Sequence, residues 1–539
     1  MRPISTDTKL SDLEKRILEL SADYGVELPE MRFFILDCWE FMSLLHKNVY
    51  PVAPPNMWEG KDMIHNRIRA KDGQESSLYY EVVQTGDPSY AYLNETNSFM
   101  GQASVMTHVV GHCNFSLLNV LHDLNDDRTE MIMYLTKKIN LLRKRIGEQA
   151  YFDYWAAAES IKHLAYPHSK YNLDVAVDTE SNYGQNPSAE SDLSDVQESQ
   201  IYSSTLDTIL KPTSHKKTLK DDMDKKLKYQ EISRKGYKLK YPCQDILGFL
   251  SRHAPAADVE HYILQYMYEV FKNHEFVRKT QIMNEGWAMY WEKKLMTDLF
   301  KEKRVGDIID YCKMFSGVCR PRPYFRRNPY HLGHNLWHHI EKEYKAGKIS
   351  LEYQEETNRQ KKENWKKPPT NEPIDFMRDV VKSVTDFEFL RRFLTPDLIE
   401  QFHLNKLPLQ YLKYFAQDTD RIYKKDKRHF WIDQDVVKDD MLETLVDFHS
   451  PRIYIVDADF NDGGLLLFHR KNSRDLRKDW IGPTLKNINF IWKNKVILLT
   501  GDELHVFNAG NSSMLKLDKA ITFEQIVDKM AAGEKFVEA

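Results

Sequence analysis

The chain of 539 residues is long enough for about two to four domains with their own hydrophobic cores. Its 76 basic and 80 acidic side chains leave a net charge of −4, which excludes the strongly basic surface of a general nucleic-acid binder. Five cysteines without a C-x-x-C motif favour a reducing compartment. The first residues contain no apolar signal core, and no run of about 18 apolar residues occurs. We therefore expect a cytoplasmic protein that binds neither nucleic acid nor membrane.

Glycine and proline are scarce, with 21 of each, whereas aromatic residues reach 12%, and this composition favours long helices over a turn-rich β-sandwich. Apolar residues recur at helical spacing in 10–23 and again over about 31–45. Tyrosine, valine and a G-D-P turn predict one or two short strands within 76–93. Helical patterns then cover about 98–121 and 128–163. The sequence thus predicts a mainly α fold whose helical body carries a small β element.

Composition also predicts the domain organisation. Residues 177–228 are rich in serine and charge and poor in apolar anchors, so we expect a flexible insertion there. It separates two halves of the helical body, 1–176 and 229–441, the second with helical patterns at 244–251, 259–271, 281–301, 332–343 and 376–394. Residues 442–539 form a predicted small α/β domain, because the short runs RIYIVDADF, GGLLLFHR, VILLTG and ELHVFNAG surround a helical stretch at 474–492.

Two histidines four residues apart, His108 and His112, lie on one face of a predicted helix and can bind one metal ion. The spacing alone is weak evidence for a metal site. His334 and His338 have the same spacing, and chance predicts about one such pair in a chain with 20 histidines. The segment MNEGWAMYW adds Glu285 on a later helix. It is similar to the N-E-x-x-A or E-G-W-A segment that supplies the third ligand of gluzincin-type zinc peptidases. This likeness implies a metallopeptidase-like body with one divalent ion, expected to be zinc, at His108, His112 and Glu285, and water in the fourth position.

A general base is missing from the position where such peptidases carry one. The residue after the first histidine is Val109, which cannot accept a proton. Glu95, just before the histidine helix, is the preferred replacement, and Glu148, Asp153 and Glu159 are the other candidates. The alternative for each is an ordinary ion pair with a nearby lysine or arginine.

Five segments together resemble the SpoVR family (stage V sporulation protein R) in order and spacing across most of residues 30–510: YEVVQTGDPSYAYLNETNS, HVVGHCNF, KTQIMNEGWAMYW, NPYHLG and YIVDADFNDGG. The resemblance implies a cytoplasmic protein linked to spore cortex formation or to stress physiology, with a serine protein kinase as a pathway partner. It supplies no biochemical activity. The chain departs from the family pattern at Glu292, where a histidine often stands, and at Met57–Lys61, which lacks another histidine.

Two further segments keep alternatives open. Asn328–Gly333 predicts a proline-set turn leading into a helix, and it either packs the helical body or lines the same cleft as the histidines. The basic run Arg320–Arg327 either contacts phosphates or an acidic partner, or is a solvated loop.

The leading hypothesis is a SpoVR-like metal-dependent hydrolase that acts on a peptide or amide bond. The competing hypothesis is a non-catalytic scaffold or regulator with a degenerate peptidase-like fold. The valine at position 109 favours the second hypothesis, whereas the combination of two histidines and a downstream glutamate favours the first.

Overall fold

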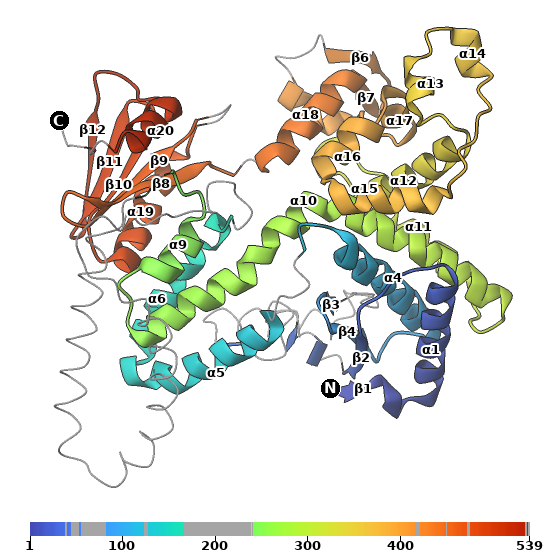
Figure 1. Ribbon diagram of the computed structural model, residues 1–539, viewed down its shortest axis with the longest axis horizontal. Helices are drawn as coiled ribbons and strands as arrows, with labels where there is room; N and C mark the ends of the chain where they lie inside the picture. Colours follow the sequence, from blue (N-terminus) through green and yellow to red (C-terminus); the bar gives the residue numbers. More distant parts are fainter. Residues whose placement is uncertain are drawn as a thin grey trace. The chain divides into compact units, whose positions relative to one another are not determined.

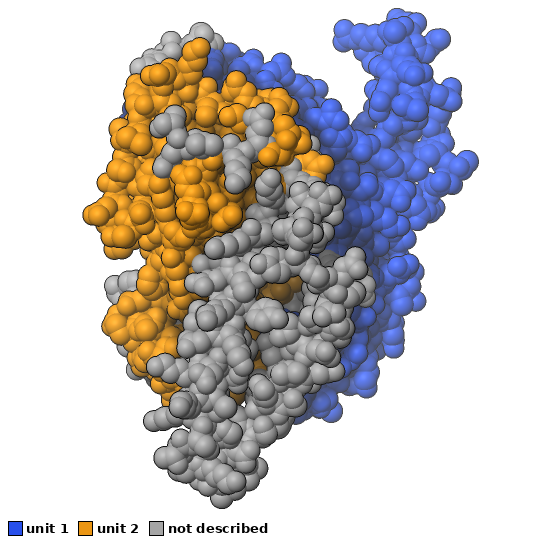
Figure 2. All heavy atoms as spheres, turned by 60° about the vertical axis from the view of Figure 1, so that its left-hand side comes forward, with its two compact units in different colours: residues 1–136, 273–450 blue, residues 137–272, 451–539 orange. Residues whose placement is uncertain are grey.

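A computed structural model describes residues 1–37, 82–122, 128–166, 241–415, 421–448, 450–471 and 475–533, with a few isolated positions between these ranges. The mainly α fold predicted from the sequence is confirmed (Figure 1). The chain forms two compact units, one of residues 1–136 and 273–450 and the other of 137–272 and 451–539 (Figure 2). The predicted insertion at 177–228 lies outside the described residues, and the predicted domain boundaries stay a prediction. Among the described residues, no helix combines the length and apolar character needed to cross a membrane.

The first unit is built mainly from helices. Its helices are α1 (Thr8–Asp23), α4 (Phe99–Leu118), the greater part of α10 (Asp258–Lys301), α11 (Ile308–Val318), α12 (Pro329–Lys345), α13 (Leu351–Glu355), α14 (Arg359–Glu363), α15 (Pro373–Ser383), α16 (Asp386–Phe393), α17 (Pro396–Gln401) and α18 (Gln434–Asp447). Two small sheets accompany them. Their strands are β1 (Arg2–Pro3), β2 (Met31–Leu36), β4 (Ser89–Asn94) and β3 (Val82–Gln84) in that spatial order, and β5 (Lys406–Pro408), β7 (His429–Ile432) and β6 (Ile422–Lys425).

The second unit combines helices with a five-stranded sheet. The helices are α6 (Glu148–Ser160), α9 (Ile246–His253), α19 (Lys478–Trp492) and α20 (Phe523–Ala531), and α5 (Arg128–Ile146) begins in the first unit and continues here. The strands, in spatial order, are β12 (Asn511–Lys516), β11 (Glu503–Asn508), β10 (Val496–Thr500), β9 (Gly464–His469) and β8 (Ile453–Phe460). Strands β9 and β10 are parallel, and α19 is the crossover helix between them, as a parallel pair requires.

The helix predicted over 31–45 is wrong for its first part, because residues 31–36 form strand β2. Met31–Leu36 pairs in parallel with β4 and, at its end, antiparallel with β1. Phe33 and Ile35 are buried on one face of this strand. A short apolar run fits both helical and strand patterns, and here the pairing with β4, far along the sequence, decides the outcome.

Several predicted helices have different ends in the structure. The helical stretch at 128–163 breaks at Gly147, whose φ of +87° lies in the region that favours glycine, and α5 and α6 form on either side. The stretch at 376–394 likewise divides into α15 and α16. Conversely, the two stretches at 259–271 and 281–301 are parts of the single helix α10, the long green helix of Figure 1.

Candidate metal centre

Helix α4 carries the two histidines in the interior of the first unit. Ser98 caps its start by accepting a hydrogen bond from the Gly101 N–H at 3.1 Å. Every residue from Met100 to Ser116 is buried, as expected for a helix that is apolar or small on all sides. His108 and His112 lie one turn apart, with ring centroids 4.8 Å from each other. The histidines therefore share one face of a buried helix.

Glu285 of α10 lies opposite these two rings. Its Oε2 is 3.5 Å from Nε2 of His112 and 3.8 Å from Nε2 of His108, and the three ligand atoms all lie within 4.8 Å of one another. Two ligands of a tetrahedral zinc ion are separated by about 3.3 Å, so these atoms need little adjustment to bind one ion. Among the described residues, no donor forms a hydrogen bond with Glu285 Oε2, although this atom is buried. A buried carboxylate oxygen of this kind fits a metal ligand.

Each histidine is held by a second side chain through its other ring nitrogen. Nδ1 of His108 donates to Oε2 of Glu292 at 2.8 Å, and the hydroxyl of Ser104 donates to Oε1 of Glu292 at 2.6 Å. Nδ1 of His112 donates to the amide oxygen of Asn284 at 2.9 Å. Because both Nδ1 atoms donate, the neutral form of each ring has its lone pair on Nε2, the nitrogen that faces Glu285, and this is the form that binds a metal.

The charge of Glu292 also affects the side chains around it. Burial, followed by this charge, raises the pKa of Tyr311 above its ordinary value. The same two causes raise the pKa of Cys319 to about 12. Both groups are therefore neutral at neutral pH, and the thiol of Cys319 is no nucleophile.

Glycines bring the three helices of the site close together. A Cβ added to Gly111 of α4 would lie 2.4 Å from Cα of Ala288 in α10. A Cβ added to Gly286 of α10 would lie 2.2 Å from the carbonyl carbon of Gly333 in α12. Gly111 directly precedes His112 in the chain, and Gly286 directly follows Glu285. Close backbone packing at these glycines therefore fixes the distance between the ligand-bearing helices.

Tryptophan side chains add hydrogen bonds between the same helices. The indole N–H of Trp287 in α10 donates to Oδ1 of Asn114 in α4 at 2.9 Å. The indole N–H of Trp337 in α12 donates to the carbonyl of Met283 at 3.0 Å. All of these groups are buried, so the bonds are shielded from water. The glycine contacts and these bonds together position the site.

Within the first unit, the structure does not bring Glu95 into the group of three ligands. Glu95 is exposed and lies 3.9 Å from the guanidinium of Arg2. Glu148 lies 3.8 Å from Arg143, and Glu159 lies 3.3 Å from Lys162. These pairs agree with the alternative of ordinary ion pairs, and the predicted catalytic role of Glu95 stays a prediction.

Val109 and the second histidine pair lie in different surroundings. Val109 is 1% exposed and belongs to the hydrophobic core of the first unit. His334 and His338 of α12 have ring centroids 4.5 Å apart, but within the described residues no third histidine, cysteine or carboxylate completes a metal site there.

Tyr330, in the N-P-Y-H-L-G segment, lies with its ring centroid 6.0 Å from that of His108. This segment therefore reaches the site as well as packing the helical body.

Sequence reasoning missed the roles of Glu292, Asn284 and Ser104. Glu292 follows Glu285 by seven residues, which is two helical turns and therefore the same face. Asn284 precedes Glu285, and Ser104 precedes His108 by one turn of α4. Helical spacing alone could have indicated that these residues lie near the candidate ligands. Only the contact between α4 and α10 shows which histidine Glu292 and Asn284 hold.

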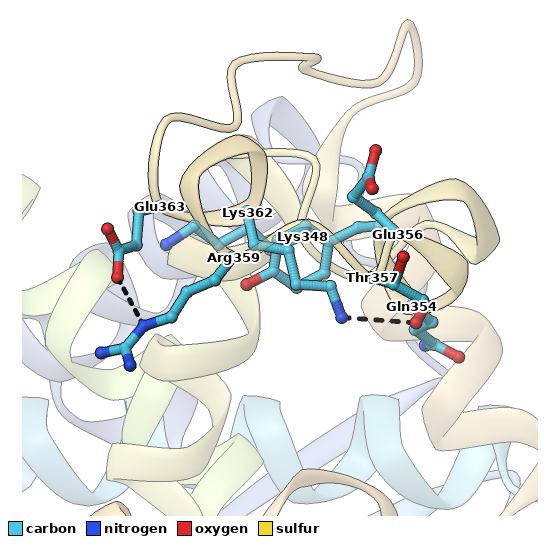
Figure 3. Close-up of a pocket in the computed structure, with 8 residues that line it drawn as sticks. Lys348, Gln354, Glu356, Thr357, Arg359, Lys362 and Glu363 are labelled. Carbon is cyan, nitrogen blue, oxygen red and sulfur yellow. Dashed lines mark hydrogen bonds and ion pairs between the residues drawn. The ribbon is translucent and has the colours of Figure 1, made fainter.

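A separate surface hollow lies at α13 and α14. Its volume is about 620 Å³, and the residues that line it are Lys348, Tyr353, Gln354, Glu356, Thr357, Arg359, Lys362 and Glu363 (Figure 3). Arg359 pairs with Glu363 at 3.0 Å, and the Lys362 ammonium donates to the Gln354 carbonyl at 3.4 Å. The hollow contains charges of both signs that pair with one another, so these charges indicate no particular class of ligand.

The sequence of this chain matches a known family. The family model described as SpoVR like protein matches residues 5–437, so the chain belongs to the SpoVR family. The chain is also similar to the uncharacterized protein YcgB of Escherichia coli (strain K12), with 25% identity over 304 residues, or 54% of this chain and 55% of that protein. The chain thus matches about half the length of this curated relative. No solved structure matches the chain.

Proposed function

We propose that this SpoVR-family protein binds one divalent ion, zinc, through His108, His112 and Glu285 and uses the site to hydrolyse a peptide or amide bond. We further propose that it works in the cytoplasm, in sporulation or stress physiology. The observation that carries the metal site is the convergence of three ligand atoms within 4.8 Å of one another. Two imidazoles and one carboxylate are one of the donor sets of catalytic zinc sites, which keep a fourth position open.

The residues around the ligands support this proposal. Glu292 and Asn284 fix the ring orientation of the two histidines, so the donor atoms are arranged before an ion binds. Both carboxylate oxygens of Glu292 are already engaged, one by His108 and one by Ser104. Glu292 therefore orients a ligand and is poorly placed to take a proton from water. A zinc ion in such a site polarises a substrate carbonyl and lowers the pKa of water.

A structural or regulatory metal site is the second candidate function. The observation in its favour is Val109, a core side chain at the position where peptidases carry their base. The low exposure of the His108 and His112 side chains, 4% and 8%, also agrees with a closed site. In this case the ion would stabilise the contact between α4 and α10 without chemistry.

Elemental analysis of protein purified without a histidine tag tests whether the metal site exists. We expect about one zinc per chain in the wild type and at least a tenfold loss in His112→Ala and Glu285→Gln, because each variant removes one of three protein ligands. His338→Ala is the matched control, since it removes a histidine of the same spacing outside the group, and it should keep its zinc. Wild-type protein without metal after zinc loading would contradict the proposal.

A second measurement separates a hydrolase from a structural site. Cobalt(II) replaces zinc and gives a visible spectrum that depends on its ligands. If the fourth position is open, acetohydroxamate should change this spectrum at millimolar concentration. A spectrum that stays unchanged while cobalt is bound would support the structural role and contradict the hydrolase.

A further inference from the structure

Asp386, the first residue of α16, contacts the interior of α10 through its carboxylate. Its two oxygens accept the backbone N–H groups of Ile282 and Met283, at 2.8 and 2.9 Å. In a regular α-helix these groups donate to the carbonyl oxygen four residues earlier in the chain. A carboxylate at this position therefore competes with the hydrogen bonds of the helix itself, and side chains inserted in this way alter the local course of a helix. A residue of α16 thus helps to fix the backbone of α10 at residues 282 and 283.

The carboxylate of Asp386 is buried, with only 1% of the residue exposed. Burial raises its pKa to about 7, and the two backbone N–H groups act in the opposite direction. A buried carboxylate loses its hydration, and hydrogen bonds must compensate for this loss. The negatively charged form is the one whose two oxygens can both accept an N–H group. The main compensation for burying Asp386 therefore comes from the backbone of α10.

The two residues that follow this contact in α10 belong to the candidate metal centre. Asn284 accepts a hydrogen bond from Nδ1 of His112 at 2.9 Å. Oε2 of Glu285 lies 3.5 Å from Nε2 of the same ring. The segment 282–285 therefore carries one proposed metal ligand and orients another, and Asp386 holds the first half of this segment.

We propose that Asp386 is a positioning residue of the metal centre: by holding the backbone of residues 282 and 283, it sets the places of Glu285 and Asn284 relative to His112. This inference rests on the proposed function, because it concerns the same site. A shift of this backbone moves the carboxylate of Glu285 and the amide of Asn284 together. A change at Asp386 therefore alters both the affinity for the ion and the geometry of its ligands.

Asp386→Asn tests this role, because it keeps the size of the side chain but replaces one acceptor oxygen with an amide donor that cannot accept an N–H group. We expect zinc binding to weaken by about 10- to 100-fold. Chelator competition on the full chain at about pH 8, above the pKa of Asp386, measures this affinity. The cobalt(II) spectrum of the loaded variant should also differ from that of the wild type, because the ligand geometry has changed. Loss of stability alone would not change this spectrum.

Asp245→Asn is the matched control for this variant. Asp245 is likewise a buried aspartate, 2% exposed, and it accepts the backbone N–H groups of Tyr166 and Gly248 at 3.0 and 3.1 Å. It belongs to the other compact unit. Its variant should lose stability in thermal unfolding but keep the zinc affinity and the cobalt spectrum of the wild type. An Asp386→Asn protein that behaves in the same way would overturn the proposal.

Hydrogen exchange of the wild type gives a second test that does not depend on the folding of a variant. If the contact between Asp386 and α10 supports zinc binding, zinc binding must support this contact, because coupling between two sites is reciprocal. Removing zinc with a chelator should therefore speed amide exchange in α16 (Asp386–Phe393). Exchange in α9 (Ile246–His253), which follows Asp245, should not change. Equal exchange of α16 with and without zinc would overturn the proposal.

Zinc content of the wild type separates failure of this inference from failure of the proposed function. A wild type that holds no zinc after loading overturns both. A wild type that holds zinc, with an affinity that does not depend on Asp386, overturns only the positioning role.

Discussion

Glu292 determines which nitrogen of His108 faces the metal ligands. We expect Glu292→Gln to weaken zinc binding by about 10- to 100-fold. The carboxylate of Glu292 holds Nδ1 protonated and raises the basicity of Nε2, and the variant removes its charge. Competition with a chromogenic chelator measures this affinity. Glu341→Gln changes a partly buried glutamate of α12 outside the site and is the matched control. Equal affinities of the Glu292 variant and the wild type would show that this contact does not tune the site.

His334 gives the protein an expected acid sensitivity. Burial, followed by the charge of neighbouring His338, lowers the pKa of His334 from 6.5 to about 3. The unfolded chain therefore takes up a proton below pH 6.5, whereas the folded protein does not. Its contribution to stability is complete above pH 6.5 and is lost as the pH falls from there towards 3, by about 1 kcal/mol between pH 7 and 5.5. Denaturant unfolding at both pH values measures the loss, which should shrink in His334→Gln. An unchanged pH dependence in that variant would contradict the assignment.

At the scale of residues, the three residues of the candidate metal centre could be predicted from the sequence. Helical spacing put His108 and His112 on one face, and the likeness to gluzincin-type zinc peptidases added Glu285. The structure places these three residues in one group. Neither the spacing nor the likeness assigned Glu292 a place at the site. The role of Glu292 depends on burial and on a contact between distant helices, and neither property is visible in a local pattern.

At the scale of elements, glycine contacts set the spacing of α4, α10 and α12. We expect Gly286→Ala to destabilise the protein by about 1–3 kcal/mol, because the new methyl group would lie 2.2 Å from the Gly333 backbone and force the helices apart. The separation should also weaken zinc binding, since Glu285 is the adjacent residue. Thermal unfolding and chelator competition measure the two effects.

Gly317→Ala is the matched control for this variant. Gly317 lies in α11, and a Cβ there meets nothing within 4 Å. Alanine in place of a helical glycine stabilises a helix by about 0.5–1 kcal/mol, so this variant should be neutral or slightly more stable. A Gly286→Ala protein that behaves like Gly317→Ala would contradict the role of close helix packing.

Helices with strong periodicity and the apolar strands β3, β4 and β8 to β11 were predictable, whereas strands β2 and β12 were not. Helices α1, α4 and α12 follow their apolar patterns within a few residues. Strand β2 was taken for a helix because its partner β4 is far away in the sequence. Strand β12, N-S-S-M-L-K, was not predicted, because every residue in it is exposed and it has no alternating pattern of apolar side chains.

At the scale of the whole molecule, all three proposed metal ligands belong to one of the two compact units. Metal binding stabilises only the folded form, by about 4 kcal/mol when free zinc exceeds the dissociation constant a thousandfold. Removing zinc with a chelator should therefore speed amide hydrogen exchange in α4 and around Glu285 of α10. Strands β9 and β10 of the other unit should not change. Equal exchange before and after chelation in α4 would contradict a bound ion at this site.

Zinc K-edge X-ray absorption on the zinc-loaded, tag-free protein tests the metal centre most directly. With His108, His112 and Glu285 as ligands, the spectrum should show two imidazole rings and oxygen neighbours, all at about 2.0–2.2 Å, and no sulfur. A Glu285→Gln sample should lose zinc or show a changed oxygen shell. Sulfur neighbours at about 2.3 Å, or the absence of imidazole scattering, would place the ion elsewhere and contradict the proposed centre.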